Sequence, residues 1–403
     1  MVALAQSATR RVVRYHFAAP PPTAQLEGFE SLLLSLGPEM SENESEPPLT
    51  PEERNYYEYI TGAVQSLEDV FSLRHKNRTS KTSTLFAAES ARFHRALYRI
   101  MMYCMLFGPN SHSAAVHTDF GERIQQHRRA FLGAFSSAEL YALHSTLEFL
   151  RELVNWVTNP EELEFVDGAH PANITLAAGP LPILAAFQTR TFRPIADVCA
   201  PRLSRHGVEN TLFAHALADI WEERGKEPPS AHSSHWRSIL DDVVGERDEC
   251  SQCGAPDGVA LWCPTNWHLL WGTDAFGPRA LPAFLPGNLK HNPSEATTLR
   301  TLTTAPSFEY PALIADLYDF GVAGWARDAP LCDACLSRLL ATHLHLWLFA
   351  RRSAEGWAAP ADCWYGYDCH LQMINFEHAQ VRNHLCAPLL LSSDDGNGAG
   401  VPG

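Results

Sequence analysis

Two Cys-x-x-Cys pairs in the C-terminal half constrain the fold of this chain more than any other feature. Cys250 pairs with Cys253, directly before Gly254, and Cys332 pairs with Cys335. Such a turn holds two thiolates on one side of a tight loop, as a tetrahedral zinc ion requires, and a following glycine permits the chain to reverse. We therefore predict that these four cysteines share one structural zinc ion, with Cys263 as an alternative ligand.

The interval between the two pairs is far longer than in compact zinc fingers. We expect it to be an insertion with its own structure, closed at its base by the metal. Free buried cysteines or a redox pair are the alternatives. No thioredoxin-like βαβ pattern surrounds either pair, which disfavours redox chemistry.

A second set of metal-ligand residues follows near the C-terminus: Cys363, Cys369, His378, His384 and Cys386. Two thiolates and two imidazoles complete a zinc shell. The two histidines are six residues apart, about 240° of rotation on an ideal helix, so they cannot face one metal from an unbroken helix. The chain must turn between them, or Cys386 must replace His384. We favour His384 because two thiolates and two imidazoles leave the zinc shell neutral.

This second set resembles the poly(ADP-ribose)-binding (PBZ) type of zinc finger. The Cys363-x5-Cys369 and His378-x5-His384 spacings match that family, and so does the aromatic-Gly pair between the cysteines. The interval between Cys369 and His378 is two residues longer than in the family. His370-Leu371 stands where the family has an aromatic-Arg pair that grips adenine and phosphates. The resemblance therefore implies a zinc fold more than it implies poly(ADP-ribose) binding.

The finger also carries candidate partner-contacting residues. Tyr365 and Tyr367 flank Gly366, so at least one ring should be exposed, and His370 can stack on a base. Arg382 is the single basic residue between Trp357 and Cys386. We expect a protein partner, and poly(ADP-ribose) is a disfavoured alternative. The candidate contact residues are Trp364, Tyr365, Tyr367, His370 and Arg382.

A broader resemblance covers more of the C-terminal half. The Cys-x-x-Cys pairs, the Tyr-Pro-x-Leu-Ile-Ala-Asp run at 310–316 and the Cys-Trp-Tyr-Gly element look like a group of basidiomycete fungal proteins to which no function attaches. Some members begin with an F-box. The Leu-Pro plus Glu-Leu-Leu pattern of an F-box is not visible near this N-terminus, so an F-box-like ubiquitin-ligase adaptor built on residues 50–110 is only an alternative.

Composition limits the function classes. Of 403 residues, 45% are apolar and 19% charged, as in a globular protein, and the formal net charge of −15 argues against general nucleic-acid or membrane-surface binding. We expect no membrane-spanning segment. Ten cysteines without a signal peptide indicate reduced thiols and an intracellular protein of the nucleus or cytoplasm. Arg10, Arg11 and Arg14 leave a mitochondrial presequence as an alternative.

Periodicity predicts several helices. Apolar residues recur at helical spacing over 52–73, and the segment 87–106 is apolar almost all round, as a buried helix would be. Ser136 and Glu139 form a capping-box pattern before a long helix that ends near Trp156. Shorter helices are expected over 212–221 and 235–243. We interpret Cys104 and Cys199 as small core residues.

These observations predict a mainly α, multidomain protein. A poorly ordered N-terminus (1–50) should precede a helical domain (51–245) and a zinc-clipped α+β domain (246–356). A small zinc finger (357–390) and a disordered tail (391–403) should follow.

Catalytic motifs are missing from the sequence: it has no Gly-x-Ser-x-Gly elbow, Walker loop, Rossmann glycine pattern or His-Glu-x-x-His helix. His343 and His345 lie two residues apart on a predicted helix and point in different directions, so they do not form a metal pair. We predict an intracellular, zinc-stabilised binding protein holding two structural zinc ions. A metal-dependent enzyme, with an incomplete zinc shell plus water, is an alternative.

Overall fold

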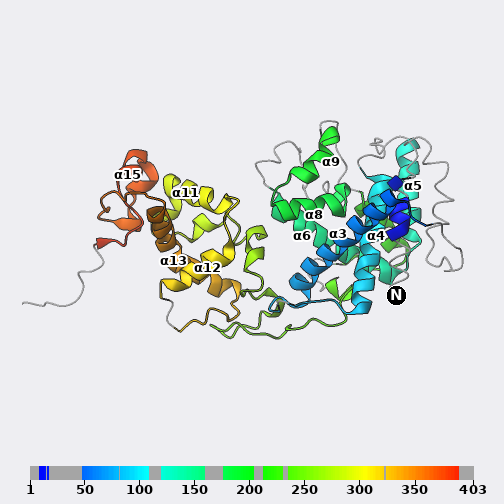
Figure 1. Ribbon diagram of the computed structural model, residues 1–403, viewed down its shortest axis with the longest axis horizontal. Coiled ribbons are helices and arrows are strands. Elements are labelled where there is room, and N and C mark those ends of the chain that lie inside the picture. Colours follow the sequence, from blue (N-terminus) through cyan, green and yellow to red (C-terminus); the bar gives the residue numbers. More distant parts are fainter. Residues whose placement is uncertain are drawn as a thin grey trace, which may run out of the picture. The chain divides into compact units, whose positions relative to one another are not determined.

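The computed structural model describes residues 9–14, 16–17, 48–80, 82–108, 119–158, 176–203, 212–229, 235–321 and 324–389. Most of the predicted poorly ordered N-terminus, and all of the predicted tail 391–403, lie outside these residues. The described chain is mainly helical, as predicted (Figure 1). None of its helices is long and apolar enough to cross a bilayer.

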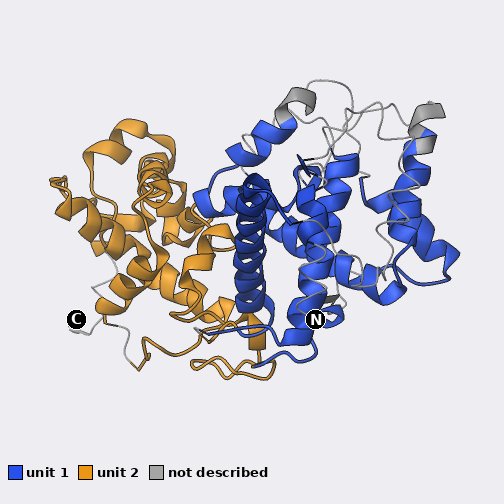
Figure 2. Cartoon of the chain, turned by 45° about the vertical axis from the view of Figure 1, so that its right-hand side comes forward, with its two compact units in different colours: residues 1–77, 82–244 blue, residues 78–81, 245–403 orange. Residues whose placement is uncertain are grey.

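The chain forms two compact units (Figure 2). Unit 1 comprises Met1–Asn77 and Thr82–Val244, and unit 2 comprises Arg78–Lys81 and Gly245–Gly403. The short segment 78–81, in the connection between the first two long helices of unit 1, therefore belongs to unit 2.

The described residues of unit 1 are mainly helical. The helices are α3 (Pro51–His75), α4 (Ala87–Phe107), α5 (Asp119–Gly133), α6 (Ser137–Val157), η2 (Leu176–Ala178), α8 (Pro180–Thr189), α9 (Arg193–Leu203), α10 (Ala214–Glu223) and η3 (His235–Ser238).

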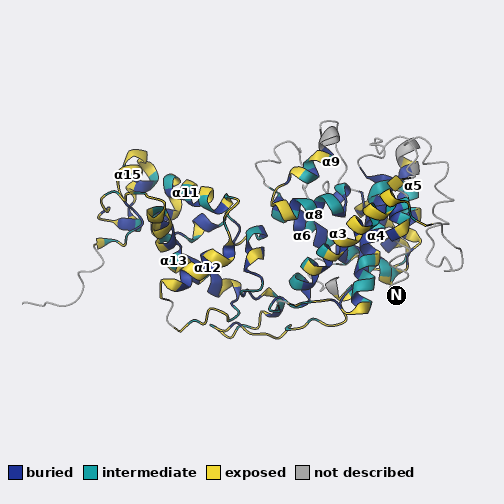
Figure 3. Ribbon diagram, in the orientation of Figure 1, coloured by how far each residue is buried: buried dark blue, intermediate teal, exposed yellow. Residues whose placement is uncertain are grey.

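Local sequence explains where the long helices start. The Thr50 and Ser136 side chains cap the N-termini of α3 and α6. In each case the carboxylate of the glutamate three residues later accepts a hydrogen bond from the backbone N–H of the cap residue. The α6 capping box predicted from Ser136 and Glu139 is thus confirmed. Figure 3 shows α3 with one buried and one exposed side, as an amphipathic helix at a surface should have.

Aromatic side chains form the centre of the unit 1 core. Phe71 of α3, Phe93 of α4 and Phe149 of α6 are fully or almost fully buried, and their ring centroids lie 4.7 to 6.0 Å apart. Edge and tilted contacts at these separations are favourable for aromatic pairs. These three rings therefore hold α3, α4 and α6 together.

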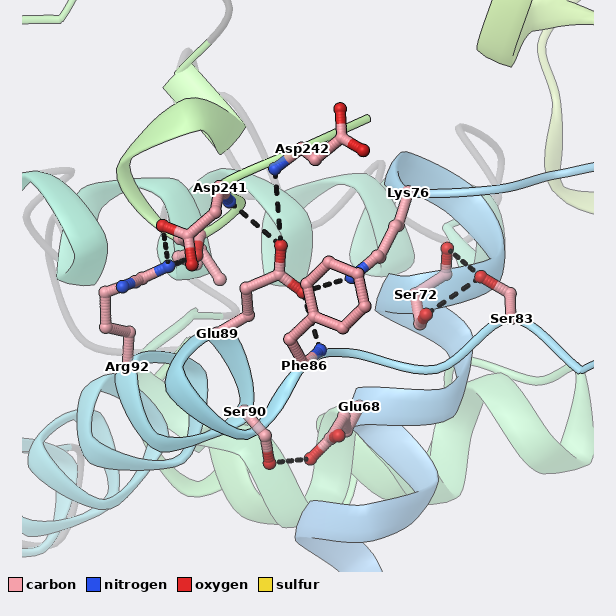
Figure 4. Close-up of polar contacts among 11 residues, drawn as sticks. Glu68, Ser72, Lys76, Ser83, Phe86, Glu89, Ser90, Arg92, Asp241 and Asp242 are labelled. Carbon is pink, nitrogen blue, oxygen red and sulfur yellow. Dashed lines mark hydrogen bonds and ion pairs between the residues drawn. The ribbon is translucent and has the colours of Figure 1, made fainter. Parts of the chain in front are cut away.

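A buried charge network fixes the end of α3 to the start of α4 (Figure 4). Glu89 is fully buried and pairs with the Lys76 ammonium, whose Nζ lies 3.3 Å from the centroid of the Phe86 ring. The other Glu89 oxygen accepts the backbone N–H of Asp241 at 2.9 Å. Burial raises the pKa of Glu89, but the Lys76, Phe86 and Asp241 hydrogen bonds outweigh it and lower that pKa below its usual value.

The prediction of a helix over 235–243 is wrong beyond the first turn: η3 ends at Ser238. The Glu89 carboxylate accepts hydrogen bonds from the backbone N–H groups of Asp241 and Asp242. In a continuing helix these N–H groups would donate to backbone carbonyls of the preceding turn. A side chain distant in sequence has therefore replaced the backbone acceptors of the helix.

The two cysteines interpreted as core residues differ in burial. Cys199 is buried, whereas Cys104 is half-buried and donates its thiol to the Leu176 carbonyl at 3.5 Å. Burial raises the pKa of Cys104, which keeps the thiol protonated and unreactive.

Unit 2 is also helical, with many short turns. Its elements are η4 (Gly258–Ala260), η5 (Trp267–Gly272), η6 (Leu281–Phe284), η7 (Gly287–His291), α11 (Pro293–Thr304), α12 (Tyr310–Asp319), α13 (Asp333–Ala354), η8 (Gly366–Asp368), α14 (Leu371–Ile374) and α15 (Phe376–Val381).

The predicted α+β character of residues 246–356 is wrong. Extended residues there pair only as isolated bridges, Glu249 with Pro256 and Trp262 with Leu331, and no strand forms among the described residues. The Trp262–Leu331 pairing stops after one residue because a turn begins at Cys263 and α13 begins just after Cys332.

The buried Arg78 anchors the segment 78–81 within unit 2. Its guanidinium lies 4.1 Å from the centroid of the Trp262 ring and donates to the Val259 carbonyl at 2.7 Å. Its own carbonyl accepts hydrogen bonds from Thr265 and Asn266 at 2.6 and 3.0 Å. Both ends of this residue are therefore tied to the stretch 259–266.

Candidate metal centres

The cysteines of the two Cys-x-x-Cys pairs come together in unit 2. The sulfur atoms of Cys250, Cys253, Cys332 and Cys335 all lie within 4.8 Å of one another, and those of Cys253 and Cys332 are 3.6 Å apart. Tetrahedral coordination with Zn–S bonds of about 2.3 Å places sulfurs roughly 3.8 Å apart. The first group, as we name these four residues, could hold one metal ion.

A tight reversal shapes the first pair. The backbone N–H of Gly254 donates to the Cys250 carbonyl at 2.8 Å, and Cys250 N–H donates to the Ala255 carbonyl at the same distance. Gly254 has φ of 69°, in the left-handed region that favours glycine. The turn brings both thiols of this pair to one side.

The second pair lies at the start of α13, next to the first. Cys332 is the residue that precedes the helix, and Cys335 lies in its first turn. The Ser251 N–H donates to the Pro330 carbonyl, and Trp262 and Leu331 exchange two backbone hydrogen bonds of 2.8 Å. These bonds close the base of the insertion between the pairs, which contains η4 to η7, α11 and α12.

Backbone donors stabilise one thiolate of this group. Burial alone would raise the pKa of Cys250, but N–H groups of Cys332, Gln252 and Cys253 point at its sulfur and lower the pKa to about 6. The Cys332 N–H lies 3.3 Å from that sulfur. Burial and the neighbouring sulfurs raise the pKa of Cys335. A bound cation would balance the negative charge that these crowded sulfurs carry as thiolates.

Cys263, the alternative ligand, lies outside the first group. Its thiol is 2.9 Å from the Thr265 hydroxyl and 3.7 Å from the Arg78 carbonyl. It contributes to the anchoring of Arg78 instead.

The second group consists of Cys363, Cys369, His378 and His384, and their ligand atoms also lie within 4.8 Å of one another. The Nε2 atom of His378 is 3.7 Å from the Cys363 sulfur and 3.3 Å from the Cys369 sulfur. These separations suit neighbouring ligands of one tetrahedral ion. The second group could hold another metal ion.

Gly366 allows the loop between the two cysteines to close. Its φ is 44°, and a Cβ atom at this position would lie 2.2 Å from the Cys386 carbonyl oxygen. Only glycine has both the conformation and the room. The Tyr367 N–H donates to that same carbonyl at 3.0 Å, which fixes the loop against residue 386.

The two histidines come from different segments. His378 lies in α15, where the Asn375 side chain accepts its N–H at 2.9 Å. The helix ends at Val381, and Arg382 is extended, so the chain turns before His384 as the six-residue spacing requires. Asn383 then pairs with Asp362 in a parallel bridge, which places His384 next to Cys363.

His384 provides an independent test of whether a metal fits. Its side chain is fully buried, and neither ring nitrogen has a hydrogen-bond partner. Burial and the nearby His378 lower the pKa of His384 to about 4, so the ring is neutral at pH 7. A buried imidazole without a partner is costly, whereas a metal ion would satisfy one nitrogen. The donor chemistry and this orphaned ring both fit a bound cation.

Cys386 does not join the second group. Its sulfur lies 3.7 Å from the Cys363 carbonyl and 3.5 Å from the Asn383 carbonyl, facing backbone rather than the other ligands.

The candidate partner-contacting residues differ in exposure. Trp364 and Tyr365 are more than half exposed, and His370 and Arg382 are exposed as well. Tyr367 is half-buried, and its ring lies 5.7 Å from that of His345 in an edge contact. Four of the five therefore face solvent.

Gln372 and Asn292 also position the second group, and the sequence did not identify them. The two buried amides share a hydrogen bond of 3.1 Å, and Gln372 also donates to the Tyr367 carbonyl. The Asn288 side chain donates to the Asp368 carbonyl. The segment 357–389 is thus tied to η7, and no local sequence signal marks a glutamine for that role.

No protein-family model, curated protein or solved structure matches this chain.

Proposed function

We propose that this chain is an intracellular binding protein held in shape by two structural zinc ions, and that the segment 357–389 contacts a protein partner. The observation that carries the proposal is that each metal-ligand group supplies four ligands. Four protein ligands fill a tetrahedral shell and leave no position for a catalytic water. This arrangement favours a structural role over a metal-dependent enzyme.

Donor type favours zinc over other metals. The first group offers four thiolates and the second offers two thiolates and two imidazoles. Tetrahedral sulfur and mixed sulfur–nitrogen sets of this kind are typical of structural zinc sites. All ten cysteines are free thiols, so the six that belong to the two groups are available as metal ligands.

Poly(ADP-ribose) binding gains little support from the surroundings of the second group. It would require cations near Tyr365 and His370. Arg352 is held by the Glu295 carboxylate, with two contacts of 2.7 Å, and Leu371 offers no charge. A polyanion would meet too few guanidinium groups.

Elemental analysis of purified full-length protein tests the proposal. We expect two zinc ions per chain, and one in each of the variants Cys332→Ser and Cys369→Ser. A different metal, or no metal in protein purified without chelator, would overturn the zinc assignment. Retention of two ions in either variant would overturn the assigned ligands.

A further inference from the structure

The segment 357–389 exposes an unusual set of large apolar side chains. Half of the fourteen exposed large apolar residues in the described part of the chain lie in this short stretch. Their exposed fractions run from 48% for Leu371 to 69% for Ile374. The seven residues are Trp364, Tyr365, Leu371, Ile374, Phe376, Val381 and Leu389.

These side chains are not needed for a core. Apart from metal ligands and Gly366, the buried residues of the segment are Gln372, Ala379, Asn383 and Leu385, of which two are apolar. So few buried apolar atoms cannot hold the segment, whereas metal binding contributes folding free energy directly. The larger apolar side chains therefore remain available to a partner.

Backbone geometry gathers the exposed residues in two places. Leu371 and Ile374 are three residues apart on α14, on neighbouring positions of one helix surface, and Phe376 opens α15 directly afterwards. The Leu389 N–H donates to the Trp364 carbonyl at 3.1 Å, so these two residues are adjacent. Figure 3 shows the exposed residues along α15.

Charge on the same segment has one predominant sign. Asp362, Asp368 and Glu377 are exposed, against the single guanidinium of Arg382. No ion pair within the described chain involves the Asp368 or Glu377 carboxylate. A zinc ion with two thiolates and two imidazoles adds no net charge. Negatively charged side chains therefore accompany the exposed apolar side chains on this segment, and this charge favours a cationic partner.

We propose that this surface docks a basic peptide segment of a partner protein, whose apolar side chains cover the α14–α15 turn and whose Lys or Arg residues face Asp368 and Glu377. The inference rests on the proposed function, since the segment must be folded around its metal. A second copy of this chain is a poor occupant, because each copy has a formal charge of −15 and would present the same acidic surface. Phosphate-rich polymers and anionic lipids are disfavoured for the same reason.

A peptide-binding titration on full-length, metal-loaded protein tests the inference. The probe is a short fluorescent amphipathic peptide of Lys and Leu, and its controls replace every Lys by Glu or every Leu by Ser. We expect only the Lys/Leu peptide to bind. The double variant Ile374→Ser/Phe376→Ser should weaken binding at least about tenfold, and Glu377→Lys should weaken it several-fold and reduce its salt dependence. Phe349→Ser, which alters another exposed aromatic of unit 2, should leave binding unchanged.

Zinc content and Tm measured on the same samples separate the two proposals. Absence of zinc would overturn the proposed function, and the inference would fall with it. Zinc-loaded protein that binds the Lys/Leu peptide equally well with and without Ile374→Ser/Phe376→Ser would overturn the inference alone. Binding of the Glu/Leu peptide, or dimerisation abolished by the double variant, would also overturn it. Slower amide exchange over 371–382 in the complex would support it.

Discussion

The indole Nε1 of Trp262 donates a 2.6 Å hydrogen bond to the carboxylate of Asp333, which stands between Cys332 and Cys335. The Trp262 backbone also pairs with Leu331, and its ring lies under the Arg78 guanidinium. One side chain therefore joins the first metal-ligand group to the anchored segment 78–81.

Trp262→Phe should lower the free energy of unfolding of unit 2 by about 0.5–1.5 kcal/mol, because the exposed Asp333 carboxylate loses its indole donor. Asp333→Asn should cost less, since its amide oxygen still accepts the indole N–H. Urea unfolding followed by tryptophan fluorescence measures both. Equal stability of Trp262→Phe and wild type would show that the hydrogen bond from Trp262 to Asp333 adds nothing to stability, because water can satisfy the carboxylate in its place.

Cys332→Ser should destabilise the protein far more than Cys199→Ser. Loss of one thiolate opens a metal site whose binding energy is folding energy, so we expect Tm to fall by roughly 10 °C or more. Cys199→Ser places a hydroxyl in the unit 1 core and should cost about 1–2 kcal/mol. Thermal melts with and without chelator compare them. Similar shifts, with no effect of chelator on wild type, would contradict a structural metal.

His384→Ala should release the metal of the second group, whereas Cys386→Ser should retain it. The first substitution removes a buried ligand and the second removes a sulfur that faces backbone carbonyls. The measurement is zinc stoichiometry after dialysis against a weak chelator, with one ion expected for His384→Ala and two for Cys386→Ser. The reverse result would make Cys386 the fourth ligand.

Glu152 should make the stability of unit 1 sensitive to acid. Burial raises the pKa of this carboxyl, but hydrogen bonding to His75 and Arg74 outweighs burial and lowers the pKa to about 2. Because the folded pKa lies below the usual 4.5, the stabilisation is complete above about pH 4.5 and is lost as pH falls toward 2. It amounts to at most about 3 kcal/mol.

Glu152→Gln should therefore flatten the decline in unfolding free energy between about pH 5 and pH 2. Urea unfolding of chelator-treated protein, followed by circular dichroism, keeps acid release of metal out of the comparison. Glu148→Gln, on the same helix, is the control for loss of a carboxylate. If the free energies of unfolding of Glu152→Gln and wild type fell in parallel as pH decreased, Glu152 would not contribute to the acid sensitivity of unit 1.

Short-range patterns predicted much of this architecture. The capping box at Ser136, the helical spacing of α3 and the apolar character of α4 are local features, and the structure has helices there. Cysteine and histidine spacing named the same eight residues that the structure gathers in two groups. Ligand chemistry restricts such sets strongly, because few residue types at few spacings can surround one ion.

Long-range contacts explain what the sequence did not predict. The helix expected to run to Val243 stops because Glu89, far away in sequence, captures its backbone donors. The described residues of 246–356 form no sheet, because Trp262 and Leu331 pair only as one residue each, between a turn and a helix. The contact between Gln372 and Asn292 joins residues eighty positions apart and has no local signature.

The assignment of Arg78–Lys81 to unit 2 has a consequence for synthesis on the ribosome. Unit 1 leaves the exit tunnel first, and domains tend to fold in the order in which they emerge. Arg78 must then wait, unpaired with Trp262 and Val259, until the polypeptide beyond Gly245 has been translated. A fragment that starts at Gly245 would lack this arginine altogether, so co-expression with a peptide covering residues 76–84 should improve its yield in soluble form. An equal yield without the peptide would show that the unit assembles unaided.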